Sequence, residues 1–361
     1  MLGRLAVVAA VLVAPTAWAR PSAGGDLCAD FGAPELAGTV ADPDLTEISG
    51  LAASRVHPDV LWTHNDSGGQ PALHAMADDG TDLGSYVVAG ASATDWEDLA
   101  AGPGTEPDRS YLYAADIGDN DAVRPSVTVY RVPEPDAAPT GAGGTLRGTE
   151  TIEVRYPDGP ADAEALLVDP VTGDLVIVTK SYAGRSHVLE APAAALVEGS
   201  PVTLADAGTI TIRPPLDGVG LPGTAVTGGD IAPDGSVVLL RTYQSVLAFA
   251  RADGQSVADA LQGTSCEAPE ADEPQGEAVA FTSAGDAYVT VSEGSSQPIH
   301  RIAVAVPAAT TSTSATTTAD ADGDEGGGAT SATVVLAVGV VVAVAAVGLV
   351  LVARRRRGRP D

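Results

Sequence analysis

Acidic side chains recur at the start of short apolar runs in this 361-residue chain. The stretch ATDWEDLAAG carries Asp95, Glu97 and Asp98 around a tryptophan, and DAEALLVD carries Asp162 and Glu164. Residues two apart share one face of a strand, so each stretch is expected to present paired carboxylates. Crowded carboxylates bind a cation, pair with Lys or Arg, or retain a proton at neutral pH. Each outcome corresponds to a different function.

These stretches are copies of one repeat. The copies are EISGLAAS from Glu47, DWEDLAAG from Asp95, DAEALLVD from Asp162, TGGDIAPD from Thr227 and QGEAVAFT from Gln275. Each copy is followed by a turn and by two further segments with the composition typical of strands. An all-β unit repeated roughly every 50 to 70 residues predicts the blades of a β-propeller, and the five copies predict five blades. A β-sandwich with coincidental repeats is the alternative.

The ends of the repeat region predict how the ring closes. The fifth copy has three strands before residue 307, and PELAGTVADPD (residues 34–44) is predicted to add the missing outer strand. Cys28 precedes that strand and Cys266 precedes the fifth copy. In a secreted chain these cysteines are predicted to form a disulfide that locks the ring. A sixth blade built from the divergent stretch 209–225 is the alternative to five blades.

The termini indicate a membrane protein. Residues 1–19 have the basic start, apolar run and small-x-small end of a signal peptide. Residues 27–306 form the predicted propeller, and residues 307–331 are rich in Thr, Ser and Gly, as is typical of a flexible stalk. Residues 332–353 carry no charge and are long enough for a transmembrane helix, and the basic tail 354–361 predicts a cytoplasmic C-terminus. The chain is therefore predicted to be a single-pass cell-membrane protein with its propeller outside.

The charge balance limits the partners of this chain. Asp and Glu number 48 against 19 Lys and Arg, and the formal net charge is −29. A surface of this sign repels nucleic acid, so no nucleic-acid partner is expected. The predicted partners are the membrane, through the single helix, and an unidentified protein, glycan or small-molecule ligand.

In a propeller the first strand of each blade lines the central channel, so the acidic copies are expected to meet at one channel mouth. In one interpretation these carboxylates pair internally with the only lysine, Lys180, and with Arg241, which occupies a similar place in the next blade. The residues of this pairing network are Lys180, Arg241, Glu47, Asp95, Asp98, Asp162 and Asp230. In the other interpretation, oxygen ligands bind Ca²⁺. The candidate ligands are Glu97, Glu164, Glu277, Asp66, Asp116, Asp119 and Asn120.

Several segments resemble a group of secreted actinobacterial β-propeller proteins that sits beside the phytase-like and gluconolactonase-like propellers. The segments are EISGLAASRVHPDVLWTHNDSGG, DWEDLA, YLYAADIGDN, VLLRTY and EPQGEAVAF, and the resemblance covers most of residues 40–305. In gluconolactonase-like propellers an acidic residue at the start of an inner strand helps to hold a divalent cation. The resemblance implies this role for Glu97, Glu164 and Glu277, whereas Ser49 and Gly229 depart from the pattern.

The predicted function is that of a surface binding and recognition module with an acidic channel mouth. The alternative is a Ca²⁺-dependent extracellular hydrolase of lactones or phosphate esters, in which the metal would activate a water molecule. No Gly-x-Ser-x-Gly nucleophile motif occurs, and the five histidines lack the spacing of a zinc site. Among the histidines, His64 falls beside the predicted mouth, where it would be a general base or a packed strand residue.

Overall fold

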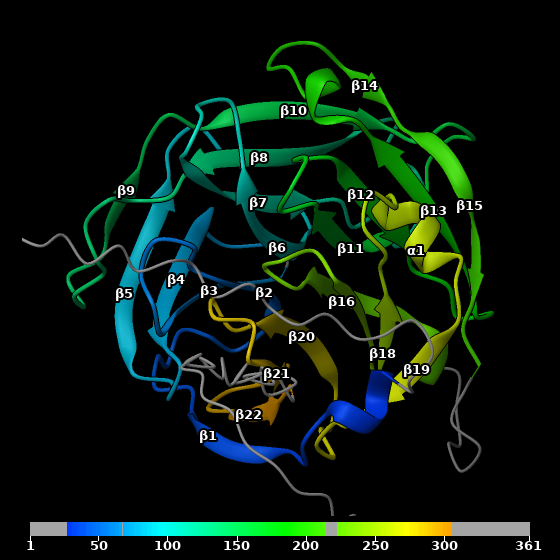
Figure 1. Cartoon of the computed structure of the whole chain (residues 1–361). Coiled ribbons are helices and arrows are strands. Elements are labelled where there is room, and N and C mark those ends of the chain that lie inside the picture. Colours follow the sequence, from blue (N-terminus) through cyan, green and yellow to red (C-terminus); the bar gives the residue numbers. More distant parts are fainter. Residues whose placement is uncertain (1–26, 67, 214–221, 305–361) are drawn as a thin grey trace, which may run out of the picture. The chain divides into compact units, whose positions relative to one another are not determined.

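The computed structural model describes residues 27–66, 68–213 and 222–304 of the chain. These residues form five sheets arranged like blades around a central axis (Figure 1). The predicted five-bladed β-propeller is therefore confirmed. The predicted signal peptide, stalk, membrane helix and basic tail lie outside the described residues. Within the part of the chain that the structure describes, no helix is long and apolar enough to cross a membrane.

The blades follow one another along the chain and are numbered here in that order. Blade 1 contains β2 (Ile48–Ala53), β3 (Val60–Asn65), β4 (Ala72–Ala77), β5 (Asp82–Val88) and β9 (Gly144–Leu146). Blade 2 contains β6 (Trp96–Pro103), β7 (Ser110–Asp116), β8 (Val127–Pro133), β10 (Glu150–Arg155) and β14 (Val202–Thr203). Blade 3 contains β11 (Ala163–Val168), β12 (Leu175–Thr179), β13 (Arg185–Ala191) and β15 (Ala205–Thr211).

The last two blades have four strands each. Blade 4 contains β16 (Val226–Ile231), β17 (Val237–Thr242), β18 (Ser245–Ala250) and β19 (Ser265–Ala268). Blade 5 contains β20 (Gly276–Phe281), β21 (Ala287–Ser292), β22 (Pro298–Ala303) and β1 (Glu35–Thr39). The short helices are η1 (Leu27–Asp30), η2 (Ala193–Ala195), η3 (Pro222–Thr224) and α1 (Val257–Leu261).

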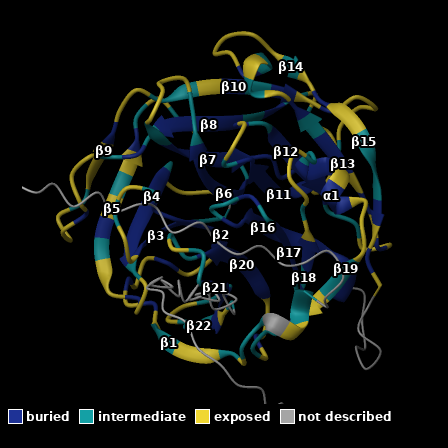
Figure 2. Cartoon of the chain, in the orientation of Figure 1, coloured by how far each residue is buried: buried dark blue, intermediate teal, exposed yellow. Residues whose placement is uncertain are grey.

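The sequence explains why the first strand of each blade lies innermost. The strands β2, β11, β16 and β20 are buried at every position and consist of apolar, small and a few acidic residues. Such strands are covered on both faces, whereas the outer strand β10 has buried residues only at two alternate positions and β15 is mostly exposed or half-buried (Figure 2). Gly173 and Gly235 have φ near +75° in the turns that follow β11 and β16, a conformation that glycine adopts at little cost.

The apolar core lies between neighbouring blades. Between blades 1 and 2, the buried rings of Trp62 and Trp96 belong to one cluster with residues of both sheets. The indole N–H of Trp62 donates to Glu134 at 3.2 Å, and that of Trp96 donates to the carbonyl of Ser92 at 2.8 Å. Each large ring thus fills the space between two sheets while its polar atom keeps a partner.

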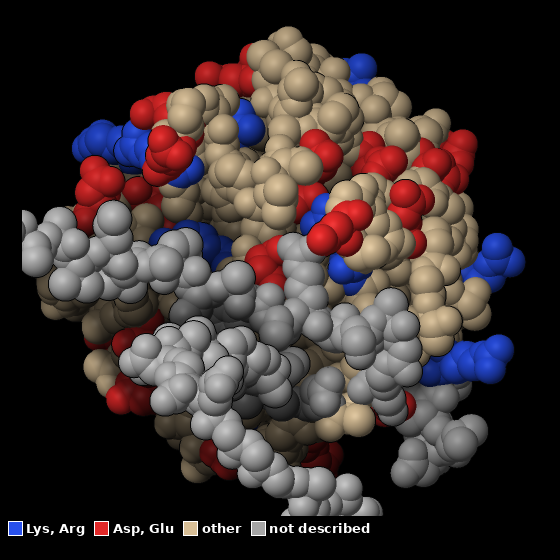
Figure 3. Space-filling view, viewed as in Figure 1, with Lys and Arg blue, Asp and Glu red and all other residues tan. Residues whose placement is uncertain are grey.

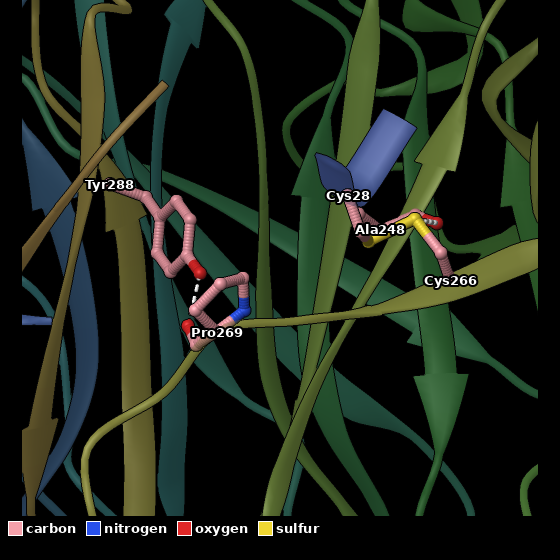
Figure 4. The surroundings of a disulfide bond; sticks show 5 residues. All are labelled: Cys28, Ala248, Cys266, Pro269 and Tyr288. Carbon is pink, nitrogen blue, oxygen red and sulfur yellow. Dashed lines mark hydrogen bonds between the residues drawn. A yellow bond between two sulfur atoms is a disulfide. The ribbon is translucent and has the colours of Figure 1, made fainter. Parts of the chain in front are cut away.

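The ring closes through the N-terminal strand, as predicted. Strand β1 pairs antiparallel with β22, so the first strand of the described chain completes the last blade. The Cys28–Cys266 disulfide is also present and joins η1 to β19 of blade 4 (Figure 4). Near it, the Tyr288 hydroxyl of blade 5 donates to the carbonyl of Pro269. We call the disulfide and this hydrogen bond the latch, and together they tie blades 4 and 5. No sixth blade appears in the described parts of residues 209–225, where β15 is the outer strand of blade 3.

Both ends of the described chain lie at the same end of the propeller. Phe31 forms a β-bridge with Val304, and Ala303 pairs with Ala287, at the end of blade 5 where β20 finishes. We call the opposite end, where the inner strands begin, the mouth. The chain therefore enters and leaves the propeller away from the mouth.

Candidate functional site

A β-bulge at the start of every inner strand shapes the mouth. In blades 2, 3 and 5 the register shift between the first two strands falls at Glu97, Glu164 and Glu277. In blades 1 and 4 it falls at Ser49 with Gly50 and at Thr227. A bulge leaves one residue out of the ladder and re-aims its side chain. Three of the five bulges therefore direct a glutamate to the mouth.

The register corrects the sequence alignment of blade 4. Val226 pairs with Thr242 where blade 3 pairs Ala163 with Thr179, so Thr227, not Gly229, corresponds to Glu164. By the same register the residue equivalent to Lys180 is Tyr243. Arg241 lies two positions earlier and was wrongly matched to Lys180, because the glycine-rich TGGD segment hides the position of the bulge.

Arg241 belongs to a different ion pair. Its guanidinium is fully buried and contacts Glu270 at 3.2 Å and Glu273 at 2.9 Å, both on the segment that leads into β20. Among the described residues it forms no salt bridge to a carboxylate of the mouth. The predicted pairing of the mouth carboxylates with Arg241 is therefore wrong in its geometry, whereas that with Lys180 is present at one carboxylate.

The mouth contains a pocket of about 80 Å³. Four of the five blades contribute acidic side chains to it, and blade 4 contributes Tyr243. The lining residues are Glu47, Ile48, Ser49, Asp66, Glu97, Asn120, Glu164, Lys180, Tyr243, Gln275, Glu277 and Glu293. Most of the predicted metal ligands thus lie on its wall.

Two overlapping carboxylate triads lie at this pocket, and Asp66, Glu97 and Glu164 of these triads line it. The first consists of Asp66, Asp95 and Glu97, and the second of Glu97, Asp162 and Glu164; in each, one oxygen per residue lies within 4.8 Å of the others. Oxygens bound to one Ca²⁺ at about 2.3–2.6 Å lie no more than about 5 Å apart, so either triad fits around a single ion. We call these five residues the acidic cluster.

The Oδ1 atom of Asp66 is buried without a hydrogen-bond partner among the described residues, and beside it lies Glu97, which is shared by both triads. Glu97 is 4% exposed, and no described group donates a hydrogen bond to its carboxylate. A buried carboxylate of this kind is costly unless a cation or a proton compensates it. Its position at the centre of the cluster therefore calls for one or the other.

Burial raises the pKa values of the mouth acids. It raises the pKa of Glu97 well above the ordinary value, and the charges of Glu164, Asp66 and Asp95 add to this effect. Burial raises the pKa of Glu164 to about 8 against the opposing effect of Lys180, and raises that of Glu277 to about 9. At neutral pH the metal-free pocket therefore retains protons that a bound cation would displace.

Acidity by itself does not distinguish this site. Acidic and basic side chains are interspersed around the rim of the face seen in Figure 3. What sets the mouth acids apart is burial, because exposed carboxylates are solvated by water and need no other compensation.

Two of the predicted mouth acids, Asp98 and Asp230, bind the backbone of the inner strands instead of lining the pocket. The Asp98 carboxylate accepts backbone N–H groups of Leu99 at 2.8 Å, Leu166 at 2.8 Å and Gly229 at 3.1 Å, and so joins blades 2, 3 and 4. Asp230 of blade 4 accepts the N–H of Phe281 in blade 5 at 2.7 Å. The carboxylate oxygens of both residues accept hydrogen bonds from the backbone N–H groups of inner strands. Both residues therefore hold the blades together and do not line the pocket.

The DIGDN segment is held by an arginine that was missed in the sequence. Arg124 pairs with Asp116 at 2.8 Å and donates to the carbonyl of Gly118 at 2.6 Å, and its own N–H donates to Asp119 at 2.7 Å. These two carboxylates are thus engaged in shaping a loop. Asn120, which is exposed, is the residue of this segment that lines the pocket. The arginine follows in the same loop (DIGDNDAVRP), a local spacing that could have indicated the pairing.

His64 is a packed strand residue. It is fully buried, its Nδ1 lies 2.9 Å from the carbonyl of Asn65, and its ring packs edge-on against Trp96 with centroids 5.5 Å apart. Burial lowers the pKa of His64 to about 4. The ring is therefore neutral at physiological pH and does not line the pocket.

Comparisons with known proteins add little to this picture. No family model matches the chain, and no curated protein matches it. Similar solved structures include the PQQ-bound aldose sugar dehydrogenase of Streptomyces coelicolor, at 12% identity over 75% of this chain and 98% of that chain with a TM-score of 0.42. Kuenenia stuttgartiensis hydrazine synthase has 13% identity over 74% and 99% of the chains with a TM-score of 0.39, and a nidogen/laminin complex has 12% over 68% and 72% with 0.37. Likeness at this level says nothing of ligand or chemistry, so function is inferred from the residues of the site.

Proposed function

We propose that this chain is a cell-surface binding module whose mouth binds one Ca²⁺, with the surrounding loops as the recognition surface. The observation that carries the proposal is the acidic cluster, in which the buried Glu97 is shared by both carboxylate triads and the Asp66 Oδ1 atom is buried without a hydrogen-bond partner among the described residues. All ligands are oxygen atoms, which favours Ca²⁺ over zinc or copper. The resemblance to gluconolactonase-like propellers at Glu97 and Glu164 supports the same role.

The layout of the propeller supports recognition at the mouth. Because the described chain enters and leaves at the opposite end, a protein anchored through its predicted membrane helix would present the mouth away from the membrane. Two exposed apolar side chains lie in loops on the mouth side, Val123 at 70% exposure and Tyr182 at 47%. Ca²⁺ takes six to eight oxygen ligands, so oxygens of a glycan or peptide would complete its coordination.

A titration of the propeller with CaCl₂ tests the proposal. The described core, the disulfide and the closing strand lie within residues 27–304, so residues 20–306 contain all of them. We expect saturable heats in isothermal titration calorimetry and a melting temperature that a chelator lowers. Glu97→Gln should abolish both effects, while Glu153→Gln, at an exposed pair on β10, should leave them unchanged. No binding heat and no effect of the chelator would overturn the proposal.

The second candidate is a Ca²⁺-dependent hydrolase, and Glu277 favours it. This glutamate lies on the pocket wall in blade 5, apart from the acidic cluster, and accepts a hydrogen bond from the Gln275 amide at 3.0 Å. Burial raises its pKa to about 9, so it carries a proton at neutral pH and could act as a general acid. Calcium-dependent hydrolysis of lactones or phosphate esters that is lost in Glu277→Gln would support this activity, and its absence from a broad screen would leave the binding module.

A further inference from the structure

The side-chain ammonium of Lys180, the only lysine of the chain, contacts a carboxylate and two aromatic rings at the mouth. Lys180 Nζ contacts the Glu164 carboxylate, and both side chains are nearly inaccessible, at 7% and 4% exposure. The same ammonium lies 5.4 Å from the ring centroid of Tyr243 and 5.8 Å from that of Tyr182. A carboxylate and two aromatic faces are the groups that recognise an ammonium ion. Its backbone N–H is also fixed, 3.0 Å from the Asp162 carbonyl.

The other blades show that this cation is specific to blade 3. The residue that follows the second strand at the mouth occupies one equivalent position in every blade, as the strand registers define it. The five residues at this position are Asp66, Ile117, Lys180, Tyr243 and Glu293. Blade 3 is therefore the one place where the fold puts a positive charge at this position.

The position of Lys180 makes the two triads unequal. In Glu97, Asp162 and Glu164, one carboxylate already holds an ammonium, whereas Asp66, Asp95 and Glu97 form no salt bridge among the described residues. A divalent ion at Glu164 would face a unit positive charge at contact distance, in a buried setting where charges are weakly screened.

We propose that the Lys180 ammonium permanently occupies the second of two overlapping cation sites and so limits the mouth to one divalent ion, held by Asp66, Asp95 and Glu97. This inference rests on the proposed calcium binding. Lys180 is then a tethered cation that determines the stoichiometry and the position of the bound ion. It leaves the ion beside blades 1 and 2, and it keeps Glu164 compensated when no ion is present.

The stoichiometry of Ca²⁺ binding in Lys180→Met tests the inference. We expect the wild-type propeller to bind one ion and the variant to bind two, because the vacated Glu97, Asp162 and Glu164 triad becomes available. The matched control is Arg251→Met, which removes an equally buried cation from Asp169 on the far side of blade 3, and which should still bind one ion. If Lys180→Met does not give a cooperative melt, Lys180→Gln keeps a hydrogen-bond donor for Glu164 and carries the same expectation.

The outcomes separate the two proposals. One ion in the wild type and two in the variant support the tethered cation. One ion in both proteins would overturn it and leave calcium binding standing, and two ions in the wild type would overturn it as well. No binding by the wild type would refute the proposed calcium site itself.

Discussion

Replacing Asp98 should destabilise the ring without changing the binding of Ca²⁺ in the pocket. Its carboxylate lies in the channel one residue beyond Glu97 and accepts three backbone N–H groups, at 2.8, 2.8 and 3.1 Å. Two of the donors, Leu166 and Gly229, belong to blades 3 and 4. Asp98→Ala would therefore remove the shared acceptor of three inner strands and leave their N–H groups buried without a partner.

The expected loss of stability follows from these contacts. Each buried N–H that loses its acceptor costs about 1–3 kcal/mol, so three of them would cost up to about 9 kcal/mol. Removing a buried charge relieves part of its desolvation cost, which is several kcal/mol. We therefore expect Asp98→Ala to lower the free energy of unfolding by about 2–5 kcal/mol. Asp98→Asn should lose less, because its amide oxygen still accepts the two N–H groups of the neighbouring blades.

Urea denaturation followed by tryptophan fluorescence measures this loss, and calcium titration of the same samples measures the pocket. Asp98→Ala should shift the urea midpoint strongly and bind Ca²⁺ as the wild type does. Glu97→Gln should lose Ca²⁺ binding and leave the urea midpoint nearly unchanged. A loss for Asp98→Ala within about 0.5 kcal/mol, as for an ordinary surface substitution, would refute the assignment of Asp98 as the link between blades. Lost calcium binding in a folded Asp98→Ala would equally contradict it.

Three further predictions concern the latch, the buried arginine and pH. Replacing Cys28 and Cys266 by Ser removes a cross-link between positions 238 apart, and on the chain-entropy model should cost about 5 kcal/mol, seen as a lower urea midpoint; an unchanged midpoint would contradict a latch role. Arg241→Met should cost about 3–5 kcal/mol because the buried Glu273 and the partly buried Glu270 lose their guanidinium partner, while calcium binding persists; a changed affinity would place Arg241 in the pocket after all. In metal-free protein the melting temperature should fall between pH 5 and pH 9, because burial raises the pKa of Glu277 to about 9. The folded state then binds more protons than the unfolded state and loses that advantage as pH rises. Ca²⁺ should reverse this fall, and a melting temperature that rises with pH in chelator would refute it.

The fold could be predicted because each blade repeats one local pattern. The repeat starts, the second and third strands and the closing strand at residues 34–44 are all visible as apolar runs between turn residues. The disulfide followed from the secreted context and from two cysteines flanking the closure. A local pattern of this kind survives because the inner strand must be buried on both faces in every blade.

The details of the mouth depended on features without a sequence signature. The register of blade 4 is set by a bulge at Thr227, and the two glycines that follow it, Gly228 and Gly229, gave no apolar pattern from which to count. The partners of Asp98 are backbone N–H groups at residues 166 and 229, which every non-proline residue carries, so the sequence could not single them out. Convergence of Glu97 and Glu164 was predictable from topology, but their unequal compensation depends on the side-chain position of Lys180.

Only three of the five bulges carry a glutamate, so the charge of the site is not distributed evenly around the channel. Where glutamate is absent, the hydroxyls of Ser49 and Thr227 bond to carbonyls of the next blade, at 2.5 Å to Glu97 and 3.1 Å to Glu277. These two positions therefore join blades instead of contributing charge. The acidic cluster is left on blades 1 to 3, so a bound ion would lie off the channel axis on that side. A ligand that completes its coordination would then contact the loops of blades 1 and 2, among them the blade 2 loop in which Val123 is exposed, and variants at Val123 should weaken ligand binding without weakening the binding of Ca²⁺ itself.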